Sequence, residues 1–334
     1  MYINQPLEIY GPLGTRAYIR SNLTYTHTFL QGRYVVHELR FPNDPPDRDF
    51  TQLRPHPSEL RNGRNIQQSF PDLGTPIDSS SSTPSTSLSA YTFTATPSFN
   101  SKSGYWPAIF SSPNLTVHAA PIKHSVPCVG YVIQESPVPL KMNPAEYVPH
   151  IKRTGAPMNL LSKIQRGENV TLPDGTTLKG LSKQPGRKIV ILGDTHDPSA
   201  IAEIADKPDL LIHESTNAHL PDVDPEHTSP EDTYESVEHQ ARSRGHSTPQ
   251  MAGRFAKRIG AKNLILNHFS TRYKADIDGD NQAVSIMNRI RELAQEQYGG
   301  KVVCAKDFMT VDIDLERVDG QEMRNSAAMQ TEES

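Results

Sequence analysis

Cysteine is scarce in this sequence of 334 residues, and long apolar runs are missing from it. The two cysteines, Cys128 and Cys304, are too few for a disulfide framework, which predicts a reducing compartment. No apolar run approaches the roughly 20 residues that a membrane-spanning helix needs. The first residues, MYINQPLEIYGP, contain no basic region followed by an apolar one, so they do not form a secretory signal.

A large excess of charge is also missing, because the formal net charge is only −4 and the isoelectric point is about 6.4. This argues against a protein that coats nucleic acid by bulk charge, although it says nothing against a local basic patch. Proline is abundant, with 28 residues, and the mean hydropathy is −0.58. These two values predict that a sizeable fraction of the chain is unfolded.

Two segments have the composition of disordered chain. Residues 43–104 are rich in Pro, Ser, Thr and Asp, as in PDLGTPIDSSSSTPSTSLSA, and show no sustained hydrophobic period. Such a segment cannot bury enough surface to offset its ordering entropy. Strand-like sequence resumes after it, so we predict a disordered insertion inside one domain. We also predict that the tail, residues 318–334, is disordered.

Three apolar strands in the second half of the chain end on acid or imidazole side chains. KIVILGDT leads to Asp194, DLLIHEST ends on His213 and Glu214, and LILNHFS ends on His268. The alternation of these strands with helical segments predicts an α/β fold. The carboxyl ends of neighbouring strands are where open α/β sheets build their sites.

Two further histidines stand at predicted element boundaries, His124 before a strand and His246 before a helix. Imidazole nitrogen and carboxylate oxygen both bind zinc. Two metal ions close together activate water and stabilise the oxygens of a phosphodiester displacement. A single strand-ending histidine is more often structural, and we interpret His213 as a ring that ties neighbouring loops together.

Together these motifs resemble the tRNase Z family of zinc phosphodiesterases, in its short form. In chain order the matching segments are LEIYGPLG, YIRSNL, YVVHEL, PIKHSVPCVGYV, ILGDT, LLIHEST, GHSTPQMAGRFAKRIGAKNLILNHFSTRYK and AKDFMTVDI, and the stretch 245–274 is the most specific. The resemblance implies an α/β fold, a metallo-β-lactamase-like αββα sandwich formed by residues 1–42 and 105–317. It also implies two zinc ions (Zn2+) and hydrolysis of pre-tRNA just 3′ of the discriminator base.

The resemblance also assigns roles to residues at matching positions. His124 resembles a ligand of the first zinc, Asp194 the carboxylate that bridges both ions, and His268 a ligand of the second. His246, together with Glu214, resembles the pair that passes a proton to the leaving 3′ oxygen. General acid chemistry of this kind suits an imidazole that is held by a carboxylate.

Residues 136–180 correspond to the protruding arm with which the family grips the elbow of tRNA. The basic side chains expected to contact phosphate there are Lys152, Arg153, Lys163 and Arg166. The alternative for these four is ordinary solvation at the surface. The stretch 155–163, GAPMNLLSK, stands where the family has a Gly-Pro-Tyr-Gly-like segment. The implied partners are pre-tRNA and a second copy of the chain in a homodimer, with no membrane.

One part of the family pattern is missing from this sequence. The HxHxDH signature, which supplies most of the family's ligands and lies upstream of LEIYGP, does not occur. We therefore expect an N-terminally incomplete fold and a truncated form of an active enzyme. The alternatives are a catalytically inactive remnant that acts as a dimer or RNA-binding partner, and a related hydrolase of a small substrate, which would not need the arm. The expected compartment is cytoplasmic and/or nuclear, with the mitochondrion left open.

Overall fold

The structure, a computed structural model, describes residues 5–45, 51–69, 104–273 and 280–315. Its strands are β1 (Leu7–Pro12), β2 (Tyr34–Arg40), β3 (Asn65–Gln67), β4 (Trp106–Ser111), β5 (Leu115–Ile122), β6 (Cys128–Glu135), β7 (Val138–Pro139), β8 (Val170–Thr171), β9 (Thr177–Leu178), β10 (Lys183–Gln184), β11 (Lys188–Ile191), β12 (Leu210–Glu214), β13 (Asn263–Asn267) and β14 (Lys301–Cys304). Its helices are α1 (Thr15–Tyr25), α2 (Pro144–Arg153), α3 (Leu160–Gln165), α4 (Tyr234–Ser243), α5 (Pro249–Arg258) and α6 (Asn281–Tyr298), with a 3-10 turn η1 (Ser199–Ile201).

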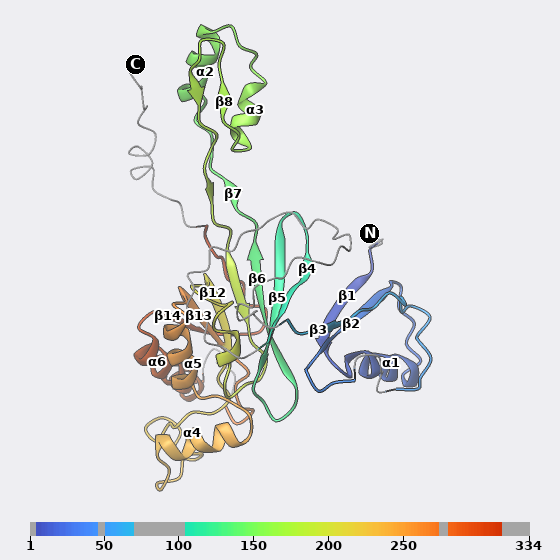
Figure 1. Ribbon diagram of the computed structural model, residues 1–334. Coiled ribbons are helices and arrows are strands. Elements are labelled where there is room, and N and C mark those ends of the chain that lie inside the picture. The colour runs from blue at the N-terminus through green and yellow to red at the C-terminus, as the bar shows by residue number, and fades with distance from the viewer. Residues whose placement is uncertain (1–4, 46–50, 70–103, 274–279, 316–334) are drawn as a thin grey trace, which may run out of the picture.

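A seven-stranded mixed sheet forms the centre of the molecule, in the order β14-β13-β12-β11-β6-β5-β4 (Figure 1). Strands β11 to β14 run parallel to one another, and β6, β5 and β4 continue the sheet in antiparallel fashion. The strands β12 and β13, with sequences LLIHE and NLILN, are largely apolar because parallel strands of this kind are buried. Leu211, Leu264 and Leu266 of these strands belong to a core that also includes side chains of α5 and α6.

Helices α5 and α6 cover one face of this sheet (Figure 1). The helix that the sequence predicts after His246 is confirmed as α5, with Pro249 at its first position and the Thr248 hydroxyl accepting the backbone N–H of Met251. A Cβ atom at Gly253 would lie 2.3 Å from the backbone oxygen of Ala294 on α6. The glycine therefore allows the two helices to pack closely.

A smaller parallel sheet, β1-β2-β3, packs between the large sheet and α1. Every residue of β2 is buried, and successive side chains of the strand point to opposite faces of the small sheet. Leu39 packs against Trp106 of the large sheet, whereas Glu38 and Arg40 form ion pairs that also include Arg16 of α1. The layers thus follow one another as helix, sheet, sheet and helix, which confirms the predicted α/β class and the αββα order that the resemblance implies.

The predicted disordered insertion over residues 43–104 is wrong for residues 51–69. This segment contributes β3, which pairs with β2, and Glu59, which forms a buried ion pair with Arg20 at 2.7 Å. The polar composition of this segment gives no sign of an ordered structure, because the residues that stabilise it lie far away in the chain. Residues 46–50 and 70–103 of the predicted insertion lie outside the described residues, and so does the predicted disordered tail.

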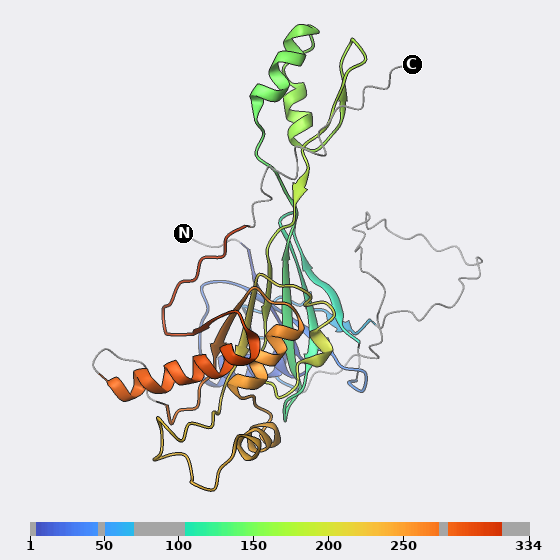
Figure 2. The same ribbon diagram turned by 90° about the vertical axis from the view of Figure 1, so that its left-hand side faces the viewer.

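The arm is a folded protrusion that stands away from the two sheets (Figures 1 and 2). The strand pair β7 and β10 connects it to β6 and β11, and α2, α3, β8 and β9 form its outer part. A separate small core holds this part together, with Ile151, Ile164, Val170, Leu172 and Leu178 buried in it. Within the described ranges of the chain, no helix is both long and apolar enough to cross a membrane.

Candidate metal centre

Three parallel strands deliver polar side chains to one edge of the large sheet. Asp194 follows β11, Glu214 is the last residue of β12, and His268 follows β13 directly. Because β11, β12 and β13 are parallel neighbours, their carboxyl ends meet at the same edge. The prediction that these strand ends converge is therefore confirmed.

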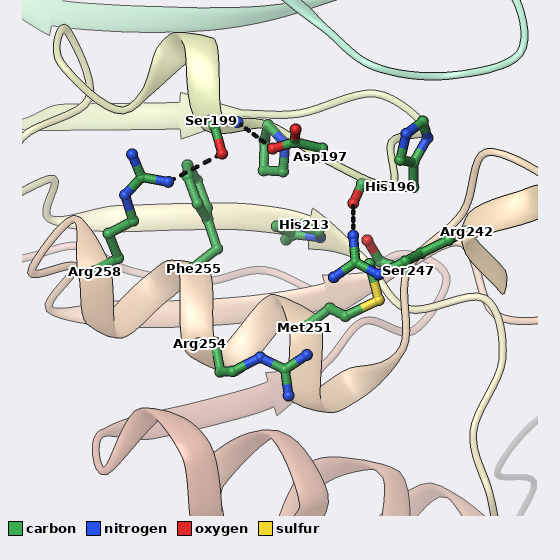
Figure 3. Close-up of a pocket in the computed structure, with 11 residues that line it drawn as sticks. His196, Asp197, Ser199, His213, Arg242, Ser247, Met251, Arg254, Phe255 and Arg258 are labelled. Atoms are coloured by element: carbon green, nitrogen blue, oxygen red, sulfur yellow. Dashed lines mark hydrogen bonds between the residues drawn. The ribbon is translucent and has the colours of Figure 1, made fainter. Parts of the chain in front are cut away.

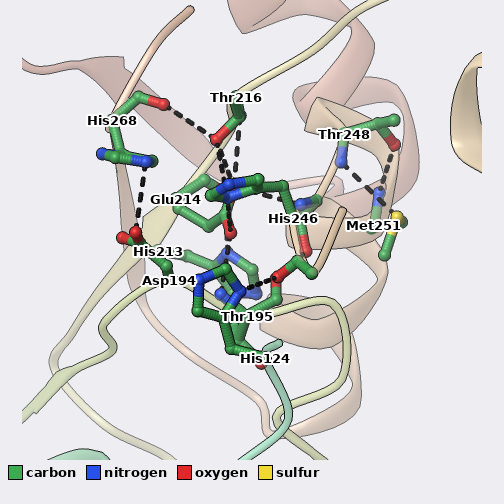
Figure 4. A network of polar contacts seen from close by, with 12 residues as sticks. His124, Asp194, Thr195, His213, Glu214, Thr216, His246, Thr248, Met251 and His268 are labelled. Carbon is green, nitrogen blue, oxygen red and sulfur yellow. Dashed lines mark hydrogen bonds and ion pairs between the residues drawn. The ribbon is translucent and has the colours of Figure 1, made fainter. Parts of the chain in front are cut away.

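Two histidines from outside the parallel strands complete the group (Figure 4). His124 lies in the turn between β5 and β6, and since β6 is antiparallel to β11, this turn reaches the same edge as Asp194. His246 lies between α4 and α5. The ligand atoms of His124, Asp194 and His246 all lie within 4.8 Å of one another. The His246 ring centre is 4.9 Å from that of His124 and 5.3 Å from that of His268.

Hydrogen bonds at Nδ1 orient the two histidines of this three-residue group. The Nδ1–H of His124 donates to the backbone carbonyl of Gly245 at 2.9 Å, because a carbonyl oxygen can only accept. Nδ1 of His246 lies 3.0 Å from Oε1 of Glu214. Both bonds leave Nε2 available on the side of the cluster. An imidazole whose other ring nitrogen is held by a carbonyl or a carboxylate is the usual arrangement of a metal-bound histidine.

Gly245 is required for the close approach of its own carbonyl to His124. Its φ of +89° lies in the left-handed region, which an L side chain rarely adopts. A Cβ atom at this position would lie only 2.0 Å from Nδ1 of His124. A side chain at position 245 would thus displace the His124 ring from the cluster.

Glu214 is the buried anchor of the site, with only 1% of its surface exposed. Besides the His246 imidazole, its carboxylate accepts the backbone N–H of Thr195 at 2.7 Å, the Thr216 hydroxyl at 2.6 Å and the backbone N–H of Ser247 at 3.0 Å. Sequence reasoning missed these three residues. Their position in the sequence could have identified them. Thr195 and Ser247 directly follow Asp194 and His246 in the motifs GDT and HST, and Thr216 lies two positions after Glu214 in HEST.

His268 forms its polar contact with the cluster through Asp194, and its ring also lies beside that of His246. Its Nε2 lies 3.3 Å from Oδ2 of Asp194. The backbone of His268 has a φ of +55°, an uncommon conformation for a residue other than glycine. This turn immediately after β13 aims the ring back toward the end of β11. Asp194 therefore contacts His268 and also belongs to the group with His124 and His246. The assignment of His268 as a zinc ligand stays a prediction.

The donor set fits a zinc ion. Two imidazoles and a carboxylate are typical zinc ligands, and a catalytic zinc uses three protein ligands and keeps one position open. The electrostatics agree, because the pKa of the nearby Cys128 thiol is raised by burial and then by the negative charges of Asp194 and Glu214. The cluster thus lies in a negative environment that suits a cation, while the thiol stays protonated.

The four predicted RNA-binding residues lie on the arm and not at the cluster. All four are exposed, but Arg153 pairs with Asp174 at 2.6 Å and Arg166 pairs with Glu168 at 2.8 Å. Lys152 and Lys163 have no acidic partner in the described parts of the chain. Strand β6 starts beside the cluster and ends beside the arm, and its 8 residues extend over roughly 27 Å. The arm and the cluster are therefore at opposite ends of the sheet.

The interpretation of His213 as a link between loops is wrong. The ring is fully buried, and its Nδ1 bonds to the backbone carbonyl of the next residue, Glu214, at 2.7 Å. Its Nε2 has no partner in the described residues.

The chain is similar to proteins named as zinc phosphodiesterases and ribonucleases Z. It is 30% identical to the bovine (Bos taurus) zinc phosphodiesterase ELAC protein 1 over 331 residues, which cover 95% of this chain and 77% of that protein. It is 34% identical to the ribonuclease Z of Brevibacillus brevis over 218 residues, or 64% of this chain and 60% of that protein. The chain matches no protein-family model.

Among solved structures, the chain has a likeness to the crystal structure of human tRNase Z, short form (ELAC1). The sequence identity is 24%, the TM-score is 0.47, and the alignment covers 93% of this chain and 70% of that chain. The chain thus spans about three quarters of the length of its ELAC protein 1 relatives and a smaller share of the bacterial enzyme.

Proposed function

The chain belongs to the tRNase Z (zinc phosphodiesterase) family, and on this premise we propose that it hydrolyses the phosphodiester bond that joins the 3′ trailer to a tRNA precursor. The observation that carries the proposal is the convergence of His124, Asp194 and His246 within 4.8 Å, with Glu214 bonded to His246. Family membership agrees with the metallo-β-lactamase-like αββα sandwich that the sequence predicts.

His124, Asp194 and His268 would hold the zinc, and this arrangement can serve two ions. Asp194 has two carboxylate oxygens, one of which lies beside His268 Nε2, while the carboxylate also lies within reach of His124. We expect Asp194 to bridge two ions, with His124 on the first and His268 on the second. Bound zinc supplies Lewis acidity, which lowers the pKa of water and stabilises charge on phosphoryl oxygens.

His246 and Glu214 are suited to moving a proton. Attack of water on the phosphorus breaks the bond to the 3′ oxygen, which leaves a 3′-hydroxyl on the tRNA and a 5′-phosphate on the trailer. His246 Nε2 would donate the proton to that leaving oxygen, while Glu214 holds Nδ1 and stabilises the imidazolium. The network on Glu214 from Thr195, Thr216 and Ser247 keeps this carboxylate in one orientation.

The arm is suited to holding the body of the RNA at a distance from the cluster. Lys152 and Lys163 are free to contact phosphate, and such contacts position an RNA without reading its sequence. Arg153 and Arg166 would first have to exchange their acidic partners for phosphate. We therefore expect the two lysines to contribute more to RNA binding than the two arginines.

A homodimer is part of this proposal. Tyr18, Tyr25 and Phe29, on α1 and just after it, expose 71%, 75% and 89% of their surface. Neighbouring exposed aromatic side chains are typical of surfaces that pack against another protein. Analytical ultracentrifugation would give a mass of two chains, and replacement of Tyr25 and Phe29 by Ser would shift it toward one chain. The expected compartment, cytosol and/or nucleus, stays a prediction.

The decisive test combines zinc loading with a cleavage assay. The chain is loaded with zinc, its metal content is measured, and it is incubated with a tRNA precursor that carries a short 3′ trailer. We expect two products, a tRNA with a 3′-hydroxyl and a trailer with a 5′-phosphate. Tight binding of the precursor by zinc-loaded chain without any cleavage would instead support the inactive, RNA-binding alternative.

A further inference from the structure

A small pocket lies beside the metal cluster, along one face of α5 (Figure 3). Its volume is about 170 Å³, several times the ~30 Å³ that one water molecule occupies in the liquid. Ser247, in its wall, follows His246 directly, and His196 lies two residues after Asp194. The pocket and the cluster are therefore built on the same two backbone segments.

The pocket carries an excess of positive charge. The arginines that line it are Arg242, Arg254 and Arg258. Glu238 pairs with Arg242 and Arg254, and Asp197 pairs with Lys123 at 2.7 Å. With Arg258 included, four positive side chains are accompanied by two carboxylates. Arg258 bonds to the Ser199 hydroxyl at 2.9 Å, and no carboxylate in the described residues pairs with it. Such a wall favours an anionic group, since arginine binds phosphate through several N–H donors.

A buried acceptor without a partner lies at the back of the pocket. His213 lines it and is 0% exposed (Figure 3). Because its Nδ1 donates to the Glu214 carbonyl, and because burial lowers its pKa, the ring is neutral and its Nε2 is an acceptor. This Nε2 has no hydrogen-bond donor in the described part of the chain. A buried acceptor without a donor is unfavourable, and a ligand with an O–H group would satisfy it.

A second imidazole nitrogen of the pocket is also buried without a hydrogen-bond partner. His196 Nδ1 is buried and has no partner among the described residues. Arg242 donates to the backbone carbonyl of His196 at 3.1 Å, which fixes the guanidinium on the backbone of this residue. The pocket thus combines guanidinium donors with two buried, unpaired ring nitrogens.

We propose that this pocket is a ribonucleotide subsite, in which the arginines hold a phosphate and His213 Nε2 accepts a hydrogen bond from the ribose 2′-hydroxyl. The inference rests on the proposed function, because the ligand would be a nucleotide of the RNA next to the one that is cleaved. A ribose 2′-hydroxyl is the donor that distinguishes RNA from DNA. The subsite would therefore give the protein a preference for RNA that does not depend on base identity.

The direct test measures the affinity of the zinc-loaded full chain for two small probes. These are uridine 5′-monophosphate and 2′-deoxyuridine 5′-monophosphate, titrated by calorimetry. They differ only in the hydroxyl that would reach His213, so we expect the ribonucleotide to bind on the order of tenfold more tightly. A histidine-selective nitrogen NMR spectrum would show the His213 Nε2 resonance moving with the ribonucleotide and much less with the deoxy probe.

Matched variants locate the binding. Arg258→Gln should weaken both nucleotides about tenfold by removing a charge-assisted bond to phosphate. Lys257→Gln removes the same charge from the neighbouring position of α5, outside the pocket, and should leave both affinities unchanged. His213→Leu leaves no acceptor at this position and should abolish the preference for ribose. If that variant does not fold, the subsite is tested by comparing Arg258→Gln with Lys257→Gln and by the NMR shift. Arg258 is exposed, so its replacement should not disturb folding.

Three results would overturn the subsite: equal affinity for the two sugars, unchanged affinity in Arg258→Gln, or a response to inorganic phosphate that matches the response to the nucleotide. Binding at the cluster is excluded by repeating the titration with Asp194→Ala, in which the ribose preference should persist. A chain that prefers ribose but leaves a tRNA precursor uncut would contradict the proposed function and leave the subsite standing. Cleavage without a ribose preference would contradict only the subsite.

Discussion

The metal cluster and the arm are assembled in opposite ways. The cluster collects residues from positions 124 to 268, a separation of 144 residues (268 minus 124), and depends on the order of strands in the large sheet. The arm is built from consecutive elements between β7 and β10 and has its own small core. The difference teaches that damage to the sheet should disable the chemistry, whereas damage to the arm should affect RNA binding alone.

The largest effect is expected from Asp194→Ala at the centre of the cluster. Loss of this carboxylate removes the group that contacts both His268 and the His124–His246 pair. The Lewis acidity of a bound metal stabilises a transition state by several kcal/mol, so cleavage of precursor should fall by about 10³-fold or more. Metal analysis should show less zinc per chain. The matched control on the arm is Asp174→Ala, which should keep its zinc; unchanged turnover in Asp194→Ala would remove this residue from the site.

The next largest effect is expected from His246→Ala. Removal of a general acid slows a reaction by roughly 10²–10⁴-fold. Zinc content measured by mass spectrometry should stay the same, because the proposal assigns this ring to the proton and not to the metal. Since His246 also lies within 4.8 Å of the other two donors, loss of zinc in this variant would identify it as a ligand.

A smaller effect on zinc affinity is expected from Gly245→Ala. The new Cβ would lie 2.0 Å from His124 Nδ1, so the ring must move and lose its hydrogen bond to the carbonyl. Loss of such an orienting bond typically weakens metal binding about 10–100-fold. Gly175→Ala on the arm is the control, because Gly175 has a similar positive φ of +85° and nothing within 4 Å. Both variants place a side chain on a strained left-handed backbone, but only Gly245→Ala should change the zinc affinity measured by competition titration.

The smallest effect is expected from the double variant Lys152→Gln and Lys163→Gln on the arm. The loss of two phosphate contacts should weaken binding of a tRNA precursor several-fold. The slope of log binding constant against log salt concentration should become shallower by roughly 1.5–2. Zinc content should not change. The control is Arg153→Gln with Arg166→Gln, where acidic partners already occupy the side chains. A larger loss in the arginine pair than in the lysine pair would contradict this ranking.

The sequence predicted the elements of the site well because short-range patterns define them. Apolar runs with polar ends identified β12 and β13, and Thr248 with Pro249 marked the start of α5. The order and spacing of the motifs also identified the family. Each of these signals lies within a few residues along the chain, where propensity, capping and alternation act.

Other features could not be predicted because their partners are remote in the chain. Residues 51–69 look disordered in composition, but β2 and Arg20 give β3 and Glu59 their partners. The acidic partner of Arg153 is Asp174, which lies beyond α3 in the chain, so the sequence gave no signal that this guanidinium would be occupied. His213 has an ordinary strand sequence, and only the folded chain shows an imidazole with an unpaired nitrogen beside three arginines.

The sequence by itself determined which groups are available: imidazoles and carboxylates at strand ends, a glycine before His246, and a basic arm. The tertiary structure alone decided which of these groups meet, which ring nitrogen of His124 and His246 stays free, and which charges are already paired. The physical reason is that hydrophobic periodicity specifies local elements, while contacts across a sheet depend on strand order, register and burial, which no short segment of sequence contains.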